Sequence, residues 1–560
     1  MATRFQKNDI LMIGLSIIGL VVFLRFYGKV YPTVSARLKV SKNQALHVAS
    51  QFLEKQGFNL EGYNQSVIFV EDDPAYLQRT LGMDQFNKIA PELPLMYWEV
   101  KFLREHDFVV RVDPQGGIIS FAHNVPGDTE GARLKQDQAL ALASTFINKR
   151  MNIDLSKYSL TVARTMEKEK RIDNDFKWKA STPYLGDAKL FISAVVCGDR
   201  VEEYGQYIEY PENLTDPYTQ ERSRGELTAN VSMELSKLLL WAAIVIAVII
   251  NKDKTIPWKG ALLLASAMAV TGLMQDINAI PNMNPFDSTQ LPLYLLWGKW
   301  TLETLESNLW SGVKAFALAI SGWIVCQEVF AVKRLNLITE FRDLLSKDFA
   351  RASFMGYLLA FIGLGYATVF YLVGRKYLNV WSPVKNGYSD MLNTYLPFLN
   401  PLTHAFQASV FEELLFRFFA IALLIKYLRS RTLALFIPAL IWGFGHSNHE
   451  VFPFYTRGVE VTVDGLIDGY FFIRYGLITV VVAHFAYDAV IDMMPLLQSS
   501  NLYYFWSGMA VVGVIGVPMM LGTIGTIKEW RFARPKEVSP VRIGMALNNK
   551  GPLDEKGGDP

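Results

Sequence analysis

The sequence predicts a polytopic helical membrane bundle of about eight to ten spans that carries an α+β domain outside the bilayer. Three observations support this fold class. Of the 560 residues, 51% are hydrophobic and 19% are charged, whereas soluble domains average about 25% charged residues. The mean hydropathy of +0.17 is too high for a purely soluble protein and low for one wholly in lipid. About two hundred polar residues separate the first apolar segment from the others.

The composition also excludes several classes of protein. With 13% aromatic residues the chain is not intrinsically disordered, and its net charge of +2 gives no indication of a nucleic-acid partner. The two cysteines, Cys197 and Cys326, are too few for a disulfide scaffold or a cysteine-rich metal site.

Residues 1–29 are expected to form an N-terminal membrane anchor. Ile10 to Leu24 is an uncharged apolar run, and Arg25 can extend its charged end to the interface. Because no small-residue cleavage site follows, we expect an uncleaved anchor and not a signal peptide.

From Leu238 onward apolar stretches recur, and some are shorter than the roughly 20 residues that a span needs. We assign residues 232–350 to accessory membrane helices, 351–528 to a membrane core and 529–560 to a tail. The apolar stretches are Leu238–Ile250, Gly260–Met274, Ala315–Val332, Ala352–Gly374, Ala405–Tyr427, Thr432–Gly445, a short Gly465–Ile473, Gly476–Ala489 and Phe505–Ile527.

Basic residues in every second loop predict the orientation, because cytoplasmic loops are enriched in lysine and arginine. The N-terminus and the tail are therefore expected in the cytoplasm, and residues 30–230 outside the plasma membrane. Arg375, Lys376 and Lys385 lie in a loop that this orientation places outside, and so run against the trend. The basic loop residues are Lys252, Lys254, Lys259, Lys333, Arg334, Arg342, Lys347, Arg351, Lys426, Arg429, Arg431, Lys528, Arg531, Arg534 and Lys536.

The outside domain contains a repeat. The pattern Gln-Ala-Leu-x-x-Ala-Ser-x-Phe at Gln44–Phe52 recurs 94 residues later at Gln138–Phe146, and strand-like alternation follows each copy. We therefore expect two similar α+β modules, residues 30–130 and 131–231, each a helix against a small antiparallel sheet. This pattern resembles the PepSY-type modules found beside extracytoplasmic proteases; the alternative is a structural domain without a ligand.

Charged residues inside apolar helices are costly and indicate function. Glu413 and Arg417 are four residues apart and can pair on one helix face, whereas Glu412 points about 100° away. We expect the pair to fix the helix and Glu412 to act on a water or a ligand. The alternative is an ion pair that only joins helices.

Two further polar positions lie in neighbouring apolar runs. His446 ends the run Thr432–Gly445, with His449 as a competitor just beyond it, and His484 and Asp488 share a face through their four-residue spacing. Taken singly, each could be a packing residue.

A depth calculation places these groups together. A helix rises 1.5 Å per residue, so Glu412 lies roughly 21 Å above Lys426 at the inner face. His446, His484 and Asp488 lie roughly 15 to 21 Å above the inner ends of their own helices. Such a set could activate water, bind a zinc-type metal or relay protons.

These motifs, in this order on successive membrane helices, resemble the CPBP (Abi/CAAX-protease) intramembrane proteases, a family that includes the Ras-converting prenyl-protein endopeptidase. The resemblance covers roughly residues 350–527. The Glu-Glu-x-x-x-Arg motif falls on Glu412 to Arg417, and Phe-x-x-x-His falls on His446 with Trp442 in the Phe position. The last motif, His-x-x-x-Asn/Asp, falls on His484 and Asp488, and Gly465–Arg474 resembles the glycine-rich helix before it.

The resemblance implies hydrolysis of a peptide bond in a peptide or membrane-protein substrate. Glu412 would be the general base and then the proton donor, positioned by Glu413 and Arg417. His446, His484 and Asp488 would bind Zn²⁺ or another divalent metal together with Glu412, or stabilise the oxyanion without a metal.

Two other functions remain open at this point. One is a catalytically silent membrane scaffold or immunity protein with the same fold. The other is a transporter with an intramembrane proton relay, although transporters usually contain paired repeats in the membrane region and none is detected among these spans.

Overall fold

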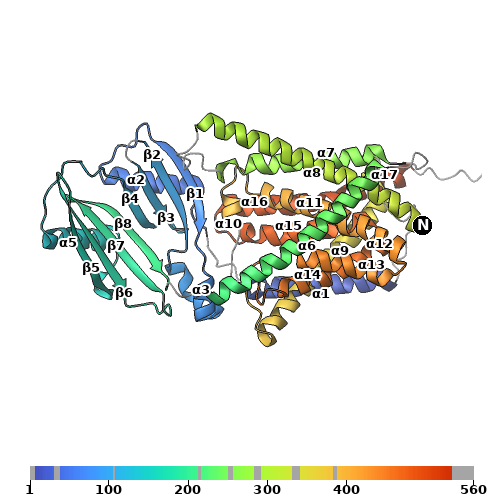
Figure 1. The fold of residues 1–560 in the computed structure, drawn as a ribbon, viewed down its shortest axis with the longest axis horizontal. Helices are drawn as coiled ribbons and strands as arrows, with labels where there is room; N and C mark the ends of the chain where they lie inside the picture. The colour runs from blue at the N-terminus through green and yellow to red at the C-terminus, as the bar shows by residue number, and fades with distance from the viewer. Residues whose placement is uncertain are drawn as a thin grey trace, which may run out of the picture.

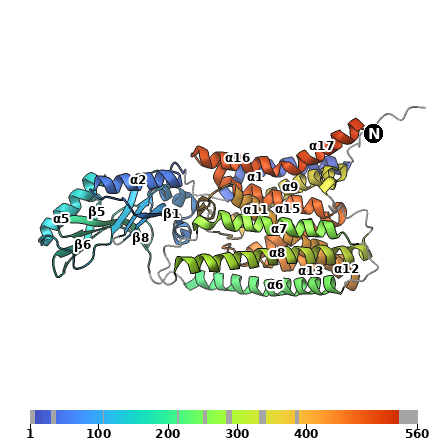
Figure 2. The ribbon, with the colours of Figure 1, turned by 90° about the horizontal axis from the view of Figure 1, so that it is seen from above.

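The computed structural model describes residues 7–30, 38–104, 107–211, 216–249, 256–282, 292–330, 341–382 and 388–532. A sheet domain and a helical bundle lie end to end along the long axis of the molecule (Figures 1 and 2). The orientation argument and the expected tail fall partly outside the described residues, at Lys252, Lys254, Lys333, Arg334, Lys385, Arg534, Lys536 and residues 533–560.

The bundle consists of helices, most of them long, and the long ones run nearly side by side (Figure 2). They are α1 (Lys7–Val30), α6 (Asp216–Val248), α7 (Trp258–Asn278), α8 (Leu293–Val329), α9 (Lys347–Tyr377), α10 (Tyr388–Leu392), α11 (Leu399–Glu412), η8 (Glu413–Ile421), α12 (Ala422–Leu428), α13 (Arg431–Phe444), α14 (Thr456–Tyr475), α15 (Leu477–Leu497), α16 (Leu502–Ile515) and α17 (Val517–Phe532), with short 3₁₀ turns η5 (Ile280–Asn282) and η7 (Phe341–Leu345).

Within the described residues, seven helical segments are long and apolar enough to cross a bilayer: α1, α6, α7, α8, α9, α15 and the consecutive α16 and α17. A shorter apolar helix, α13, packs against α14, which in turn packs against α15. The expectation of an integral, mostly helical membrane protein is therefore confirmed.

One continuous helical run from α11 through η8 to α12 forms the centre of the bundle. Its middle part, Glu413–Ile421, is a π-helix whose nine residues are all buried, and π-helical turns occur frequently at functional sites. The run ends at Arg429, which adopts the left-handed conformation with φ 53°. Ser430 then begins α13, because its side chain accepts a hydrogen bond from the Leu433 amide.

The sheet domain contains eight strands and several short helices. The strands are β1 (Asn64–Glu71), β2 (Met96–Leu103), β3 (Phe108–Val112), β4 (Ile118–His123), β5 (Tyr158–Glu167), β6 (Ile172–Ala180), β7 (Lys189–Cys197) and β8 (Arg200–Glu209). The helices are α2 (Lys42–Lys55), α3 (Ala75–Leu81), α4 (Met83–Ile89), η1 (Ala90–Glu92), α5 (Gln136–Thr145), the π-helical turn η2 (Phe146–Arg150) and η3 (Leu155–Lys157).

All eight strands form one antiparallel sheet in the order β1-β2-β3-β4-β8-β7-β6-β5. The sequence predicts a separate small sheet in each module, but the structure joins the two sets of four strands. The junction is the pairing of Ser120–Ala122 in β4 with Glu203–Gly205 in β8. Pairing satisfies backbone groups that two separate sheets would each leave exposed at an edge.

The two repeated helices, α2 and α5, pack into one hydrophobic core with the sheet. Ala45 and Ala49 of α2 and the equivalent Ala139 and Ala143 of α5 are all fully buried. The small alanine side chains let each helix approach the strands closely, which is the physical basis of the repeated pattern.

The sheet domain is attached to the bundle through the outer edge of β1. The Asn393 side chain, just after α10, accepts from the Phe69 amide at 2.6 Å and donates to the Phe69 carbonyl at 2.9 Å. Ser499 and Ser500, after α15, both donate to the carbonyl of Leu38. These bonds fix the domain at one end of the bundle; the side of the membrane on which it lies stays a prediction.

Candidate active site

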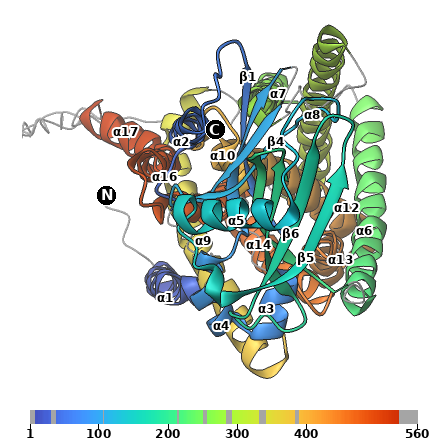
Figure 3. The same cartoon turned by 90° about the vertical axis from the view of Figure 1, so that its left-hand side faces the viewer.

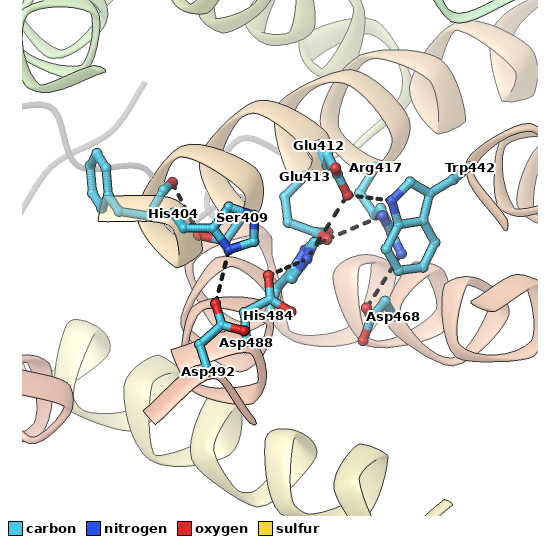
Figure 4. A network of polar contacts seen from close by, with 11 residues as sticks. His404, Ser409, Glu412, Glu413, Arg417, Trp442, Asp468, His484, Asp488 and Asp492 are labelled. Carbon is cyan, nitrogen blue, oxygen red and sulfur yellow. Dashed lines mark hydrogen bonds and ion pairs between the residues drawn. The ribbon is translucent and has the colours of Figure 1, made fainter. Parts of the chain in front are cut away.

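A cavity of about 970 Å³ lies inside the bundle, lined mainly by α9, α11, α13, α14 and α15 and by the segment between α13 and α14. Four of the residues expected to act on a substrate line this cavity: Glu412, His446, His484 and Asp488. The prediction that they share one polar cavity agrees with this placement. Figure 4 shows how the polar side chains of α11, η8 and α15 face one another.

Glu413 and Arg417 form the expected ion pair, at 3.1 Å, with both side chains almost completely buried. Arg417 also pairs with Asp468 of α14 at 3.3 Å, and its guanidinium group lies 3.9 Å from the centre of the Trp442 ring. Because two carboxylates and an aromatic ring surround this cation, the group joins η8, α13 and α14 rigidly.

Glu412 occupies a different environment from its neighbour. Its side chain is 22% exposed, whereas the Glu413 side chain is fully buried. The indole Nε1 of Trp442 donates a hydrogen bond to Glu412 Oε2, and His484 Nε2 lies 3.9 Å from the same oxygen (Figure 4). The carboxylate is thus held from two sides while it remains accessible from the cavity.

His484 lies between two other carboxylates. Its Nδ1 is 2.9 Å from Glu413 Oε1, and its Nε2 is 3.2 Å from Asp488 Oδ2. Both ring nitrogens therefore face hydrogen-bond acceptors, an arrangement that suits the positively charged ring. The four-residue spacing of His484 and Asp488 produces the contact that the sequence predicts.

His446 lies just beyond the end of α13. Its Nδ1 is 2.9 Å from the Trp442 carbonyl, so the assigned tautomer has a proton on Nδ1 and a free electron pair on Nε2. His449 is close by, with 5.6 Å between the two ring centres, and lines the same cavity. Among the described residues no hydrogen bond or ion pair joins His446 to Glu412 or His484.

The expected metal ligands do not converge on one point in this arrangement. Nowhere in the described part of the chain do three or more histidine, cysteine, aspartate or glutamate side chains form a group that could hold a metal ion. Of the candidate set Glu412, His446, His484 and Asp488, the His484 ring already has a carboxylate at each nitrogen. A metal would require these side chains to rearrange, and the metal-bound alternative stays a prediction.

Sequence reasoning missed several residues of the site. Asp468 and the indole donor of Trp442 both contact the predicted residues directly. A second pair, His404 and Asp492, lies in the same cavity with 2.9 Å between Nδ1 and Oδ2 (Figure 4). The available signal was the spacing, because His484, Asp488 and Asp492 follow one another at intervals of four.

The comparisons with known proteins agree with the resemblance that the motifs indicate. Residues 394–490 match the family described as "Type II CAAX prenyl endopeptidase Rce1-like", and all six predicted site residues fall inside this segment. The chain is also 24% identical over 506 residues to the sporulation-killing factor biosynthesis protein SkfC of Bacillus subtilis (strain 168), an alignment that covers 86% of this chain and 94% of that protein. No solved structure matches the chain.

Proposed function

We propose that this protein is an intramembrane endopeptidase that hydrolyses a peptide bond with a water molecule activated by Glu412. The position of the Glu412 carboxylate carries the proposal: it faces the cavity and is held by Trp442 and His484. The match of residues 394–490 to a family of prenyl endopeptidases supports the same class of reaction.

In the first step Glu412 removes a proton from a water molecule in the cavity. The water oxygen attacks the carbonyl carbon of the peptide, and the carbonyl electron pair moves to its oxygen. His446 Nε2 accepts a hydrogen bond from the other hydrogen of the water and so fixes its orientation. A positioned general base contributes about 10² to 10⁴-fold to the rate.

The second step breaks the carbon–nitrogen bond. We assign the positive charge of His484, which Glu413 and Asp488 stabilise, to the negatively charged oxygen of the tetrahedral intermediate; because both ring nitrogens already face carboxylates, His484 acts there through its charge. As this oxygen re-forms the carbonyl, Glu412 transfers its proton to the leaving nitrogen. The products are a new carboxyl terminus and a new amino terminus.

Glu413, Arg417 and Asp468 are positioning residues in this scheme. Glu413 and Arg417 are too deeply buried to reach a substrate. Their ion pairs instead fix the helix that carries Glu412 and the ring of His484. Preorganisation of this kind matters because displacements of about 1 Å reduce rates strongly.

We also propose that the protein lies in the plasma membrane with its sheet domain outside the cell and its N-terminus in the cytoplasm. The support is the alternation of basic loops along the sequence. The substrate is then a peptide or membrane protein that reaches the cavity from the bilayer or from its surface.

Hydrolysis can be tested with the full-length protein purified in detergent and incubated with a peptide library in ¹⁸O-water. We expect defined products whose new carboxyl termini contain ¹⁸O, because the oxygen of the activated water is retained there. A protein that binds peptides but produces no labelled terminus would contradict the proposal and favour the scaffold function.

A further inference from the structure

The cavity that contains Glu412 has an acidic lining. Arg457 is the single arginine or lysine among its described lining residues, and even together with four histidines it is outnumbered by the carboxylates. An enclosed surface with one sign of charge concentrates ligands of the opposite sign. The carboxylate residues are Asp390, Glu412, Glu450, Glu460, Asp464, Asp468, Asp488 and Asp492.

Most of these carboxylates already have a partner within the protein. Asp390 is an exception: it lines the cavity and is exposed to solvent. The paired carboxylates are Glu412 with Trp442, Glu450 with Arg222, Glu460 with Arg457, Asp468 with Arg417, Asp488 with His484 and Asp492 with His404.

Asp464 differs from the other carboxylates inside the cavity. It lies on α14 between Glu460 and Asp468 at intervals of four residues, so the three share one helix face. Arg457 pairs with Glu460, and Arg417 pairs with Asp468. In the described part of the structure, no hydrogen bond or ion pair joins the Asp464 carboxylate to another side chain.

The helix opposite Asp464 leaves space beside its carboxylate. Gly363 of α9 lines the cavity there, and a Cβ atom added to it would lie 3.5 Å from Asp464 Oδ1 and 3.4 Å from the Tyr487 ring. Ala360, one turn away on α9, is also small and also lines the cavity. A side chain that enters from a substrate therefore finds an accessible carboxyl oxygen of Asp464 and only small residues on the helix opposite it.

The distance from Asp464 to the reacting groups limits where such a side chain can come from. Asp464 is one helical turn from Asp468, which lies beside Arg417 and Trp442, and one turn is roughly 6 Å. From Asp468 the contacts continue through Arg417 and Trp442 to Glu412, so an extended peptide needs a few residues to reach from Asp464 to the reacting carboxylate.

We propose that Asp464 selects substrates with a lysine or arginine side chain within a few residues of the bond that is cut. This inference rests on the proposed endopeptidase function. Asp464 is partly buried and has no ion pair of its own, so a substrate cation that pairs with its carboxylate makes a contact that a neutral side chain cannot replace.

The test compares pairs of peptides that differ only by lysine or norleucine at one position near the cleavage site. We expect the wild-type protein in detergent to cleave the lysine peptide with kcat/KM higher by about tenfold or more, and Asp464→Asn to reduce this ratio to about one. Asp390→Asn is the matched control: this carboxylate of the same cavity is exposed to solvent, so its replacement should leave the ratio intact.

Each outcome separates this inference from the proposed function. Equal cleavage of both peptides by the wild-type protein, or an unchanged ratio in Asp464→Asn, overturns the role of Asp464 but leaves the endopeptidase. Failure to cleave any peptide overturns the endopeptidase itself. If Asp464→Asn does not fold, Gly363→Leu, which fills the space beside the carboxylate, is expected to lower the ratio in its place.

Discussion

Glu412 and Glu413 are adjacent in the sequence and lie in opposite environments. Glu413 is enclosed by Arg417 and His484, while Glu412 faces the cavity, accepts a hydrogen bond from Trp442 and has His484 at a longer distance of 3.9 Å. Two carboxylates in different surroundings can have different chemical roles. The contrast follows from the helix geometry, which separates consecutive side chains by about 100°.

Replacement of Glu412 by glutamine separates catalysis from folding. The glutamine oxygen can still accept the hydrogen bond from Trp442, but it cannot take a proton from water. We expect cleavage to fall by about 10²-fold or more and the melting temperature to stay close to that of the wild type. Glu450→Gln, which changes a carboxylate of the same cavity that pairs with Arg222, is the control; a fully active Glu412→Gln protein would contradict the assignment.

Removal of the Arg417 side chain has a different effect, because it leaves Asp468 without a cation and Glu413 with only His484. We expect a loss of stability of about 3 to 5 kcal/mol, visible as low abundance in membranes and an earlier thermal transition of Arg417→Ala. Arg474→Ala, at an exposed position of α14, should have little effect. Equal stability of the two variants would show that the buried pair is dispensable.

The geometry of the site also predicts how activity responds to removal of metal ions. Because Glu412, His446, His484 and Asp488 do not converge on one point, we expect cleavage by the purified protein to persist after treatment with 1,10-phenanthroline. The chelator-treated sample is analysed for bound zinc in parallel. Loss of cleavage that is restored by added Zn²⁺ would establish the metal-bound alternative.

At the scale of single elements, the Asn393 side chain makes two of the hydrogen bonds that attach β1 to the segment around α10. Asn393→Ala leaves the N–H and C=O groups of Phe69 without their partner, a loss of about 1 to 3 kcal/mol for a buried group. We expect faster hydrogen exchange in β1 and little change in β6. Asn59→Ala, an exposed asparagine of the same domain, is the control, and identical exchange in both variants would rule out this role of Asn393.

The sequence predicts some helices well and others poorly, for a common physical reason. The expected run Thr432–Gly445 corresponds to α13, Arg431–Phe444, because that helix is apolar over most of its length. By contrast, only Gly465–Ile473 was expected of α14, which extends from Thr456 to Tyr475. Glu460, Asp464 and Asp468 lower its hydropathy, so the carboxylates that line the cavity also hide the helix from an analysis based on apolar runs.

The sequence predicts the contacts of the candidate site that lie within one helical run and misses those between elements. Glu413 with Arg417, and His484 with Asp488, are contacts within one helical run, and a four-residue spacing reveals them. Contacts between elements, such as Trp442 with Glu412 or Arg417 with Asp468, depend on how helices pack. Helix packing is set by many side chains at once, so no single spacing in the sequence tells which side chains of two different helices will meet.

At the scale of the whole molecule, the sheet domain projects from one end of the bundle (Figure 1). If that end lies outside the cell, protease treatment of intact cells should remove residues 38–211 and leave the membrane helices protected. Inside-out vesicles provide the control, since there the domain should be protected. Protection in intact cells would place the domain in the cytoplasm and reverse the predicted orientation.

The strand order of the sheet reads the same from either end, with the fourth strand of each repeat, β4 and β8, meeting in the middle. Figure 3 shows β4 and β6 between the outer strands β1 and β5. An approximate twofold axis therefore passes between Phe121 and Tyr204, which pair across the junction. The outer strands β1 and β5 are equivalent under this axis, yet only β1 is covered by the bundle, through Asn393. Attachment to the membrane helices thus breaks the internal symmetry of the sheet domain. The edge strand β1 contacts the bundle, whereas the equivalent edge strand β5 has Leu160 and Val162 exposed to solvent.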